Sequence, residues 1–359
     1  MTAAPGKRGG PREAGTLKAM VLAAGAGTRL RPLTYATPKP MVPVVNRPVL
    51  HHVLDNLARH GIRDAVLNLW AYPGQVRDYC GDGSRWGLRL RYSRERTLLG
   101  TAGAVKKMER FFRDGPLLIM SGDGLSDVDI TALYAFHRER RSLATMVTKG
   151  IDARFAYGVT LAGKTGRIRG FLEKPSWGQV FSNQVNTGIY LFEPGVLRHI
   201  PKGFYDFGHE LWPKLLRLKK PIYAWEWKGY WCDVGNLAEY RNGQRAALKG
   251  EVAVEVPGRR LRRGVWVEEG ARIHPRARLV APCAVGARAR VERGAVVGPC
   301  TTVGAGAKIG RNAIVKNCIL FDKTAVGAGA YLDNCILGAG GAVRSGAIAY
   351  DAAVMDVRH

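Results

Sequence analysis

A strict six-residue period in the last third of the chain limits the possible folds more than any other feature of the sequence. From Leu261 to Phe321 every sixth residue is apolar, and glycine and alanine are dense between these positions. Short segments repeated at this interval are typical of a parallel β-helix, in which each strand stacks on the strand one coil earlier. The repeated residues are Leu261, Val267, Ile273, Leu279, Val285, Val291, Val297, Val303, Ile309, Val315 and Phe321.

The repeat resembles left-handed β-helices, in which three hexapeptides make one triangular coil and each apolar residue points inwards. Beyond Phe321 the period slips and continues loosely through Val326, Leu332, Leu337 and Val343. Cys300 and Cys318 are eighteen residues apart, which is one coil, so we expect them to stack. No His or carboxylate accompanies them at ligand spacing, and we interpret both as small interior residues rather than as a metal or redox site.

The chain before the repeat follows a different pattern. Residues 1–17 are rich in glycine, proline, alanine and charge, which predicts a disordered extension. Residues 18–248 alternate short β-rich runs with amphipathic helical runs, which predicts an α/β domain with a mostly parallel sheet covered on both faces. Because the pattern changes after Gly250, residues 249–359 are assigned to the β-helix domain.

Within the α/β domain the periodicities predict individual elements. The less regular residues 158–227 should form a lobe on the substrate side. Expected helices are 49–59, 102–112, 130–141 and 206–218. Expected strands are 19–23, 65–69, 88–92, 117–120, 143–148, 158–161, 168–173, 186–192 and 222–227.

Composition narrows the functional class. The 55 Lys and Arg outnumber the 29 Asp and Glu, giving a formal charge of +26, but there is no long basic block and no nucleic-acid-binding motif. We therefore expect phosphorylated small substrates rather than nucleic acid. The six cysteines include no C-x-x-C pair, and no apolar run approaches the roughly 20 residues of a membrane span. A cytoplasmic protein with no membrane partner is expected.

The segment 21–47 carries the strongest functional signal. Gly25 and Gly27 lie in a loop directly after the first expected strand, where a missing Cβ lets backbone N–H groups approach a ligand closely. Arg29 and Lys39 add cations, which indicates polyanion binding. A Walker A loop is excluded because no Lys follows Gly27, and a dinucleotide fingerprint is excluded by Leu30.

This segment, V-L-A-A-G-A-G-T-R-L-R-P-L-T followed by P-K-P, closely resembles the signature of sugar-1-phosphate nucleotidyltransferases. The acidic residue that this family would place three positions before Leu99 is Arg96 here, with Glu95 one place away, so base selection stays open. Further motifs resemble the same family: L-G-T-A-G at 99–103, S-G-D-G around Asp123, F-L-E-K-P at 171–175, N-T-G at 186–188 and W-C-D-V-G around Asp233.

The resemblance implies a role for each matched residue. Arg29 would stabilise the leaving pyrophosphate, and Lys39 and Lys174 would act on the attacking side. Asp123 and Asp233 would hold Mg²⁺, a hard cation that takes oxygen ligands. The implied nucleotide contacts are Leu22, Ala23, Ala24, Gly25, Gly27, Thr28, Arg29, Gly100, Thr101, Ala102 and Gly122. The implied sugar contacts are Gly158, Glu173, Lys174, Asn186 and Thr187.

The expected reaction converts an NTP and a sugar 1-phosphate into an NDP-sugar and pyrophosphate. The motifs, the D-F-G-H-E-L-W-P helix and the β-helix most resemble mannose-1-phosphate guanylyltransferases, so GTP and mannose 1-phosphate are the expected substrates. Glucose 1-phosphate or a cyclitol phosphate with GTP, UTP, dTTP or ATP is the alternative. A non-catalytic regulatory subunit is an alternative of another class. A third is a bifunctional enzyme whose β-helix is an acyltransferase using His274 as base.

The β-helix is expected to act in assembly. Its coils bury their apolar residues internally, and its two ends present sheet edges that must be capped or covered. Closed symmetric homo-oligomers are the usual outcome for such a surface. We therefore predict a homo-oligomer formed through or near the β-helix.

Overall fold

The computed structural model of the chain describes residues 17–151, 157–176 and 180–355, which form two compact units. Of the described residues, the first unit holds Leu17–Gly25, Val53–Gly122 and Val128–Trp231; the second holds Ala26–His52, Asp123–Asp127 and Cys232–Met355. Leu17 is buried, and the remainder of the extension expected at 1–17 lies outside the described residues. No helix in the described ranges is long and apolar enough to cross a membrane.

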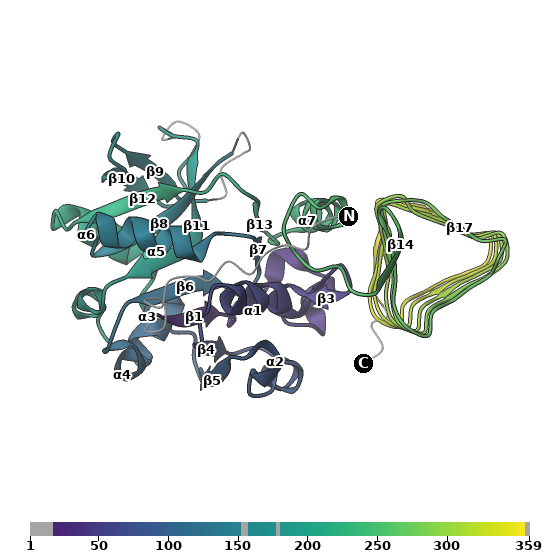
Figure 1. Cartoon of the computed structure of the whole chain (residues 1–359), viewed down its shortest axis with the longest axis horizontal. Helices are drawn as coiled ribbons and strands as arrows, with labels where there is room; N and C mark the ends of the chain where they lie inside the picture. The colour runs from purple at the N-terminus through teal and green to yellow at the C-terminus, as the bar shows by residue number, and fades with distance from the viewer. Residues whose placement is uncertain (1–16, 152–156, 177–179, 356–359) are drawn as a thin grey trace, which may run out of the picture. The chain divides into compact units, whose positions relative to one another are not determined.

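The first unit is built on a nine-stranded sheet (Figure 1). At its centre β1 pairs in parallel with β4 on one side and with β6 on the other, and β4 pairs in parallel with β5. The parallel strands confirm the α/β domain with a mostly parallel sheet that the strand and helix alternation predicted, and the domain is Rossmann-like. Their bounds are β1 (Lys18–Leu22), β4 (Asp64–Leu69), β5 (Arg89–Arg94) and β6 (Leu117–Ser121).

The segment expected to form a lobe on the substrate side continues this sheet. β11 runs antiparallel to β6 and β8, β9 runs antiparallel to β10 and β11, and β12 lies parallel to β8. Strand direction is not encoded in a period-two pattern, which is why the sequence did not reveal these reversals. The bounds are β8 (Ala144–Gly150), β9 (Val159–Ala162), β10 (Ile168–Leu172), β11 (Gln184–Phe192) and β12 (Ile222–Glu226).

Helices cover the sheet with an aromatic core beneath them. α5 packs on β8, β11 and β12, and its N-cap Asp129 accepts a hydrogen bond from Ala132 N at 2.9 Å (Figure 1). The helix expected at 102–112 is two helices, and a π-helical turn, η8 (Phe207–Leu211), precedes α6. Phe192, Phe207 and Trp212 are buried against one another. Helix bounds are α1 (Val49–Arg59), α2 (Pro73–Cys80), α3 (Gly100–Lys107), α4 (Glu109–Phe112), α5 (Ile130–Glu139) and α6 (Trp212–Arg217).

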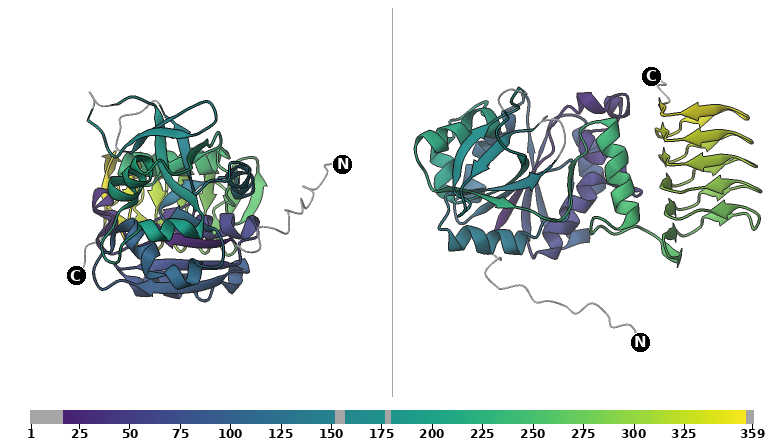
Figure 2. Two further views of the ribbon diagram at one scale, coloured as in Figure 1. Left: turned by 90° about the vertical axis from the view of Figure 1, so that its left-hand side faces the viewer. Right: turned by 90° about the horizontal axis from the view of Figure 1, so that it is seen from above.

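The second unit contains the predicted β-helix, whose coils stack as three parallel sheets (Figures 1 and 2). Sheet one consists of β15 (Val265–Val267), β18 (Cys283–Val285), β21 (Thr301–Val303), β24 (Ile319–Leu320), β27 (Ile336–Leu337) and β30 (Ala353–Val354). Sheet two consists of β16 (Arg272–Ile273), β19 (Arg290–Val291), β22 (Lys308–Ile309), β25 (Ala325–Val326) and β28 (Ala342–Val343). Sheet three consists of β17 (Arg278–Leu279), β20 (Val296–Val297), β23 (Ile314–Lys316), β26 (Tyr331–Asp333) and β29 (Ile348–Tyr350).

The prediction of interior residues is wrong at both ends of the repeat. Leu261 lies on β14 (Arg259–Arg262), which runs antiparallel to β15, and it is 47% exposed instead of interior. Phe321 is not an interior residue either, because Leu320 takes that position beside Val303. Phe321 packs against the ring of Tyr240, with ring centroids 6.5 Å apart.

A shortened coil explains why Phe321 is not an interior residue and why Cys318 does not stack on Cys300. Cys283 pairs with Thr301, eighteen residues on, whereas Thr302 pairs with Ile319, only seventeen residues on. The missing residue shifts the register before Phe321. Cys318 therefore stacks between Thr301 and Cys335 and not on Cys300: Thr301 Oγ1 accepts from Cys318 N at 3.3 Å, and Cys318 Sγ accepts from Cys335 N at 3.4 Å. Both Cys318 and Cys335 are fully buried, in line with a packing role.

Sheet one is covered from outside by two pieces of the second unit. These are α7 (Leu237–Lys249) and the hairpin of β2 (Pro43–Val44) and β3 (Arg47–Pro48). The buried amide of Gln244 joins all three elements, since its Nε2 donates to Thr302 Oγ1 at 2.7 Å and its Oε1 accepts from Val45 N at 2.9 Å. Asn46 Nδ2 donates to Val303 O at 3.1 Å.

The corrected register predicts different costs for two leucines. Leu320→Ala should lower the free energy of unfolding by about 2–5 kcal/mol, because it leaves a cavity inside the β-helix. Leu261→Ala, the matched control, should change it by less than about 0.5 kcal/mol, because that side chain is largely in solvent. Urea unfolding of both variants checks this, and equal losses would contradict the register.

Candidate active site

Asp123 and Asp233 are brought together by a small sheet in the second unit. β7 (Gly124–Ser126) pairs with β13 (Trp231–Asp233), so Asp123 stands just before one strand and Asp233 ends the other. Val234 N donates to Asp123 O at 3.2 Å and closes the pair. The glycine after Val234 has a steric reason, because a Cβ on Gly235 would lie 2.6 Å from Asp233 Oδ2.

Lys39 links the two carboxylates. Its Nζ donates to Asp233 Oδ1 at 3.0 Å and forms a closer ion pair with Asp123 Oδ2. Only 8% of the residue is exposed. Burial alone lowers the pKa of the Lys39 ammonium, but the charges of Asp123 and Asp233 outweigh it and raise the pKa above its usual value. Lys39 is therefore a fixed positive charge between two acids.

Arg29 completes this group from the short 3₁₀ helix η2 (Thr28–Leu30), where its Nη2 lies 3.6 Å from Asp233 Oδ2. Gly27 makes this approach possible: its φ is +65°, and an added Cβ would lie 3.0 Å from Thr34 Cγ2 and 3.1 Å from Lys39 Cβ. Thr34 Oγ1 donates to Gly27 O at 2.7 Å. The loop that carries Arg29 is thus packed directly against the lysine that holds the acids.

The surroundings of Asp233 disfavour its ionised form. Burial raises the pKa of the Asp233 carboxyl, and the neighbouring charge of Asp123 adds to this, while Lys39 and Arg29 only partly offset both effects. A further cation at this point would therefore stabilise the ionised form of Asp233. We call Arg29, Lys39, Asp123 and Asp233 the acidic centre.

The acidic centre fits a magnesium ion in its donor chemistry. Both carboxylates offer oxygen ligands, and Mg²⁺ is commonly held by one or two carboxylates plus substrate phosphates and water. Among the described residues there is no cluster of three or more His, Cys, Asp or Glu that could hold a metal without a substrate. The residues present therefore match an ion that arrives with phosphates.

In the first unit, the strand ends before the glycine loop are held by their neighbours. Ala23 N donates to Asn68 Oδ1 at 2.8 Å, and Gly122 N donates to Leu22 O at 2.9 Å. Ala24 is also buried, whereas Gly25 is exposed. The predicted nucleotide contacts Leu22, Ala23, Ala24 and Gly122 thus lie together at the carboxyl ends of β1 and β6, where ligands bind in open α/β sheets.

Glu95 is a supporting residue that the sequence analysis did not assign. It is 4% exposed; its Oε1 accepts from Asn68 Nδ2 at 2.8 Å and its Oε2 accepts from Leu99 N at 2.9 Å. Through Asn68, one carboxylate joins the backbone of Ala23 to the start of the L-G-T-A-G segment. The family signature has an acidic residue at the position of Arg96, which drew attention to the neighbouring Glu95. Only the contacts reveal the role of Glu95.

The L-G-T-A-G segment begins α3 and packs against residues 203–206. Ala102 N and Gly103 N both donate to Tyr205 O, at 2.9 and 3.0 Å, and Thr101 Oγ1 donates to Asp206 Oδ2 at 2.8 Å. Gly100 has a φ of +71°, and an added Cβ would lie 2.5 Å from Tyr205 O. These contacts explain the motif by packing; the nucleotide contacts of Gly100, Thr101 and Ala102 stay a prediction.

Glu173 is the most suggestive of the predicted sugar contacts. Its carboxylate lies between two glycines, since a Cβ on Gly158 or Gly208 would come within 2.5 or 2.4 Å of Glu173 Oε2. That oxygen is buried and has no hydrogen-bond partner among the described residues. Burial raises the pKa of Glu173, partly offset by Lys174. A buried acceptor without a donor is costly unless a ligand supplies one.

The other predicted sugar contacts lie near Glu173 in the chain or in the sheet. Lys174 is exposed and has a φ of +44°. Asn186 N donates to Gly158 O at 2.8 Å, and Asn186 Nδ2 donates to Tyr190 OH at 2.8 Å. Thr187 is buried and its Oγ1 donates to Val147 O at 2.7 Å, which is a structural contact.

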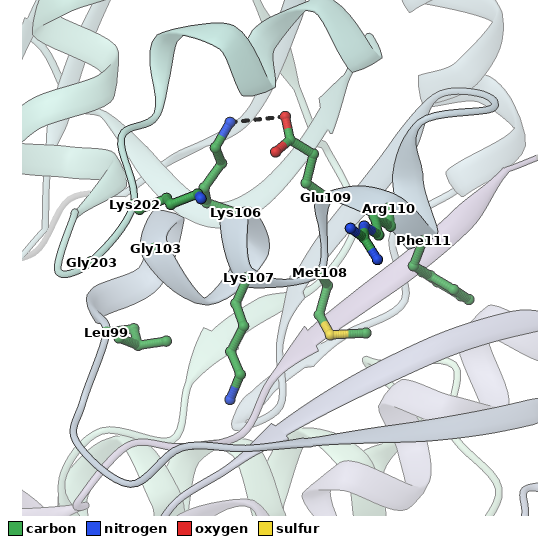
Figure 3. Close-up of a pocket in the computed structure, with 10 residues that line it drawn as sticks. All are labelled: Leu99, Gly103, Lys106, Lys107, Met108, Glu109, Arg110, Phe111, Lys202 and Gly203. Atoms are coloured by element: carbon green, nitrogen blue, oxygen red, sulfur yellow. Dashed lines mark hydrogen bonds and ion pairs between the residues drawn. The ribbon is translucent and has the colours of Figure 1, made fainter.

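A separate cavity of about 690 Å³ lies along α3 and α4 (Figure 3). Lys106, Lys107, Arg110 and Lys202 line it, and Lys106 Nζ donates to Glu109 Oε1 at 2.8 Å. None of the residues assigned to catalysis, nucleotide or sugar lines this cavity. We do not assign the substrates to it.

Comparison with known proteins agrees with this site chemistry. Residues 18–250 match the family described as Nucleotidyl transferase, and residues 279–356 match the GMPPB C-terminal domain. A UTP–glucose-1-phosphate uridylyltransferase of Synechocystis sp. is 34% identical over 96% of this chain and 94% of its own. A mannose-1-phosphate guanylyltransferase of Mycobacterium tuberculosis is 32% identical over 84% of this chain and 82% of its own.

A solved structure agrees at the level of the fold. A putative glucose-1-phosphate thymidylyltransferase from Bacillus anthracis, crystallised with a sucrose, aligns with a TM-score of 0.59 and 24% identity. The alignment covers 64% of this chain and 95% of that one.

The contacts of Glu95 generate a prediction. Glu95→Gln should lower the free energy of unfolding by about 1–3 kcal/mol, because its amide cannot accept two hydrogen bonds at both positions and leaves a buried donor unpaired. The amides of Ala23 and Leu99 should also exchange hydrogen faster. Urea unfolding and hydrogen exchange measure both effects, with the exposed Glu139→Gln as control. Unchanged exchange at both amides would refute the supporting role.

Proposed function

Since the chain belongs to the Nucleotidyl transferase family, we propose that it joins GTP to mannose 1-phosphate and releases pyrophosphate. The general activity is that of a sugar-1-phosphate nucleotidyltransferase of nucleotide-sugar biosynthesis. The acidic centre carries this proposal: two acids bridged by a buried lysine and approached by Arg29, next in the chain to a glycine loop, suit the handling of phosphates.

The choice of guanine and mannose is supported by the C-terminal match to the GMPPB C-terminal domain and by the Mycobacterium tuberculosis relative. The uridylyltransferase of Synechocystis sp., which matches nearly the whole chain, favours UTP and glucose 1-phosphate as the second candidate. The same reaction with dTTP or ATP, or with a cyclitol phosphate, is the remaining alternative of this class.

In the proposed reaction an oxygen of the sugar phosphate attacks the α-phosphorus of the NTP. A new P–O bond forms there, and the bond between the α-phosphorus and the bridging oxygen breaks, so that pyrophosphate leaves with the electron pair. Phosphoryl chemistry of this kind depends on positioning and charge stabilisation, with little covalent work by the protein. Asp123 and Asp233 would hold Mg²⁺, which would neutralise charge on the phosphate oxygens.

The protein's own cations divide between the two substrates in this proposal. Arg29, the most exposed member of the acidic centre, stabilises the leaving pyrophosphate. Lys39 fixes the two acids and acts with Lys174 on the attacking side. Leu22, Ala23, Ala24, Gly25, Gly27, Thr28, Gly100, Thr101, Ala102 and Gly122 are the proposed nucleotide contacts.

The acceptor sugar is assigned to the residues around Glu173. Its unpartnered Oε2 can accept a hydrogen bond from a sugar hydroxyl, which would satisfy the buried oxygen. Lys174 is free to contact the sugar phosphate from its exposed position, with Gly158, Asn186 and Thr187 as further proposed contacts.

Two alternatives of other classes have less support. A non-catalytic regulatory subunit would gain nothing from keeping the charge of Lys39 buried, an arrangement that costs stability. For an acyltransferase, His274 would have to serve as base, but its Nδ1 accepts a hydrogen bond from Arg276 N at 3.0 Å within a turn.

We place the enzyme in the cytoplasm, with its substrates as partners and with no nucleic-acid or membrane partner. We keep the domain boundaries at 18–248 and 249–359 and a homo-oligomer formed through or near the β-helix.

Asp233→Asn should lower kcat by about two or more orders of magnitude, as the loss of one charge-stabilising group typically does. Folding should be retained, because Lys39 keeps its ion pair with Asp123. Steady-state pyrophosphate release at saturating Mg²⁺ measures the effect, and Asp78→Asn, a change at an exposed position on α2, is the control. Turnover close to that of the wild type would remove Asp233 from the catalytic machinery.

The substrate assignment is tested by offering GTP, UTP, dTTP and ATP separately with mannose 1-phosphate, glucose 1-phosphate and a cyclitol phosphate, and by reading pyrophosphate release. We expect the highest kcat/KM for GTP with mannose 1-phosphate. Preference for UTP with glucose 1-phosphate would establish the second candidate, and absence of turnover with every pair would overturn the proposed activity.

A further inference from the structure

The three outer faces of the β-helix differ in chemistry. The outward residues of sheet one are Ala284, Thr302, Ile319 and Ile336, and all are buried beneath the elements that cover this sheet. On sheet two Arg272, Arg290 and Lys308 are aligned on consecutive coils and exposed. Like charges in register repel, so sheet two is a solvated face. The outer face of sheet three is neither buried like that of sheet one nor lined with like charges like that of sheet two.

Sheet three carries an apolar row on its outside. Val296, Ile314, Tyr331 and Ile348 are register partners on four consecutive coils. Their neighbours Val297, Val315 and Leu332 point into the β-helix, which places the row on the outer surface. Ile348 is 69% exposed and Tyr350, also on β29, is 62% exposed. With strands about 4.8 Å apart, the row is roughly 14 Å long.

Beside this row lies a pair of opposite charges. Lys316 and Asp333 are register partners on adjacent coils, two residues after Ile314 and Tyr331 respectively. Lys316 Nζ lies 5.4 Å from the centre of the Tyr331 ring, and Asp333 Oδ1 accepts from Asn317 Nδ2 at 2.8 Å. Asp333 therefore uses one oxygen for its turn, and its charge is not neutralised by that contact.

We propose that sheet three binds sheet three of a second copy of this chain, across a two-fold axis that runs parallel to the strands between β23 and β26. Such an axis reverses the order of the coils and keeps each residue's place along the strand. Ile314 then faces Tyr331 of the second copy, and Val296 faces Ile348. Lys316 faces Asp333 of the second copy, and the symmetry repeats this pair.

This arrangement is favoured over other occupants by its self-complementarity. A like-charged row, as on sheet two, cannot meet itself, but a Lys next to an Asp on adjacent coils meets its opposite under this symmetry. The inference rests on the homo-oligomer proposed above and identifies its contact face. Because the patch is small, we expect a weak dimer that dissociates on dilution.

A charge exchange tests the contact in the full-length chain. Lys316→Asp and Asp333→Lys each place like charges opposite each other in both symmetry-related pairs, so each should weaken dimerisation at least about tenfold. The double variant Lys316→Asp/Asp333→Lys should restore it. Sedimentation velocity over a concentration series gives the dissociation constants. Arg290→Glu, on the exposed face of sheet two, is the matched control and should leave dimerisation unchanged.

A second variant covers the case in which a charge variant fails to fold. Ile314→Ser changes only the apolar row and should also weaken dimerisation, with circular dichroism confirming the fold. A wild-type chain that is monomeric at all concentrations would overturn both this inference and the homo-oligomer. An oligomer unaffected by the charge variants and by Ile314→Ser would overturn the sheet-three contact alone. Pyrophosphate release, measured on the same samples, reports separately on the proposed activity.

Discussion

One buried ammonium between two carboxylates is the interaction on which the second unit's chemistry depends. Lys39, Asp123 and Asp233 come from three separate segments of the chain, and without the two carboxylates Lys39 would be an uncompensated charge in a buried position. Gly27 and Gly235 lack a side chain where one would collide with this group. The segment that supplies Lys39 continues directly into the β2–β3 hairpin, which is fixed to the β-helix through Gln244 and Asn46. The β-helix therefore helps to hold the lysine segment in place.

In the first unit, hydrogen bonds hold the ligand-binding edge of the sheet in place. Glu95, buried and fully hydrogen-bonded, ties the end of β1 to the start of α3, and Tyr205 O receives both free amides at that helix start. Glu173 Oε2 is one of several buried polar atoms that lack a hydrogen-bond partner among the described residues, and it lies where the motif comparison expects the sugar. A donor on a bound ligand would satisfy this oxygen.

The sequence was sufficient for most of the fold and for naming the residues of the acidic centre, whose catalytic roles stay a prediction. Motif order identified Lys39, Asp123 and Asp233, and the structure brings these three together. What it missed has physical causes. Phe321 fits a six-residue count, but a coil shortened by one residue moves Leu320 into the interior. The apolar positions showed a slip of the period, but it was placed after Phe321 and not before it. Leu261 fits the same count on a strand that runs the other way. Glu95 could not be recognised as a support, because its partners Asn68 and Leu99 are distant from each other in the sequence.

We infer that a divalent ion and the substrate phosphates meet at the acidic centre. Mn²⁺ binding followed by electron paramagnetic resonance, with and without GTP, tests it directly, because Mn²⁺ takes the same oxygen ligands as Mg²⁺. We expect GTP to strengthen Mn²⁺ binding to the wild type, beyond the binding of Mn²⁺ to free GTP. Asp123→Asn should remove this gain. Equal Mn²⁺ binding by the wild type and by this variant in the presence of GTP would contradict it.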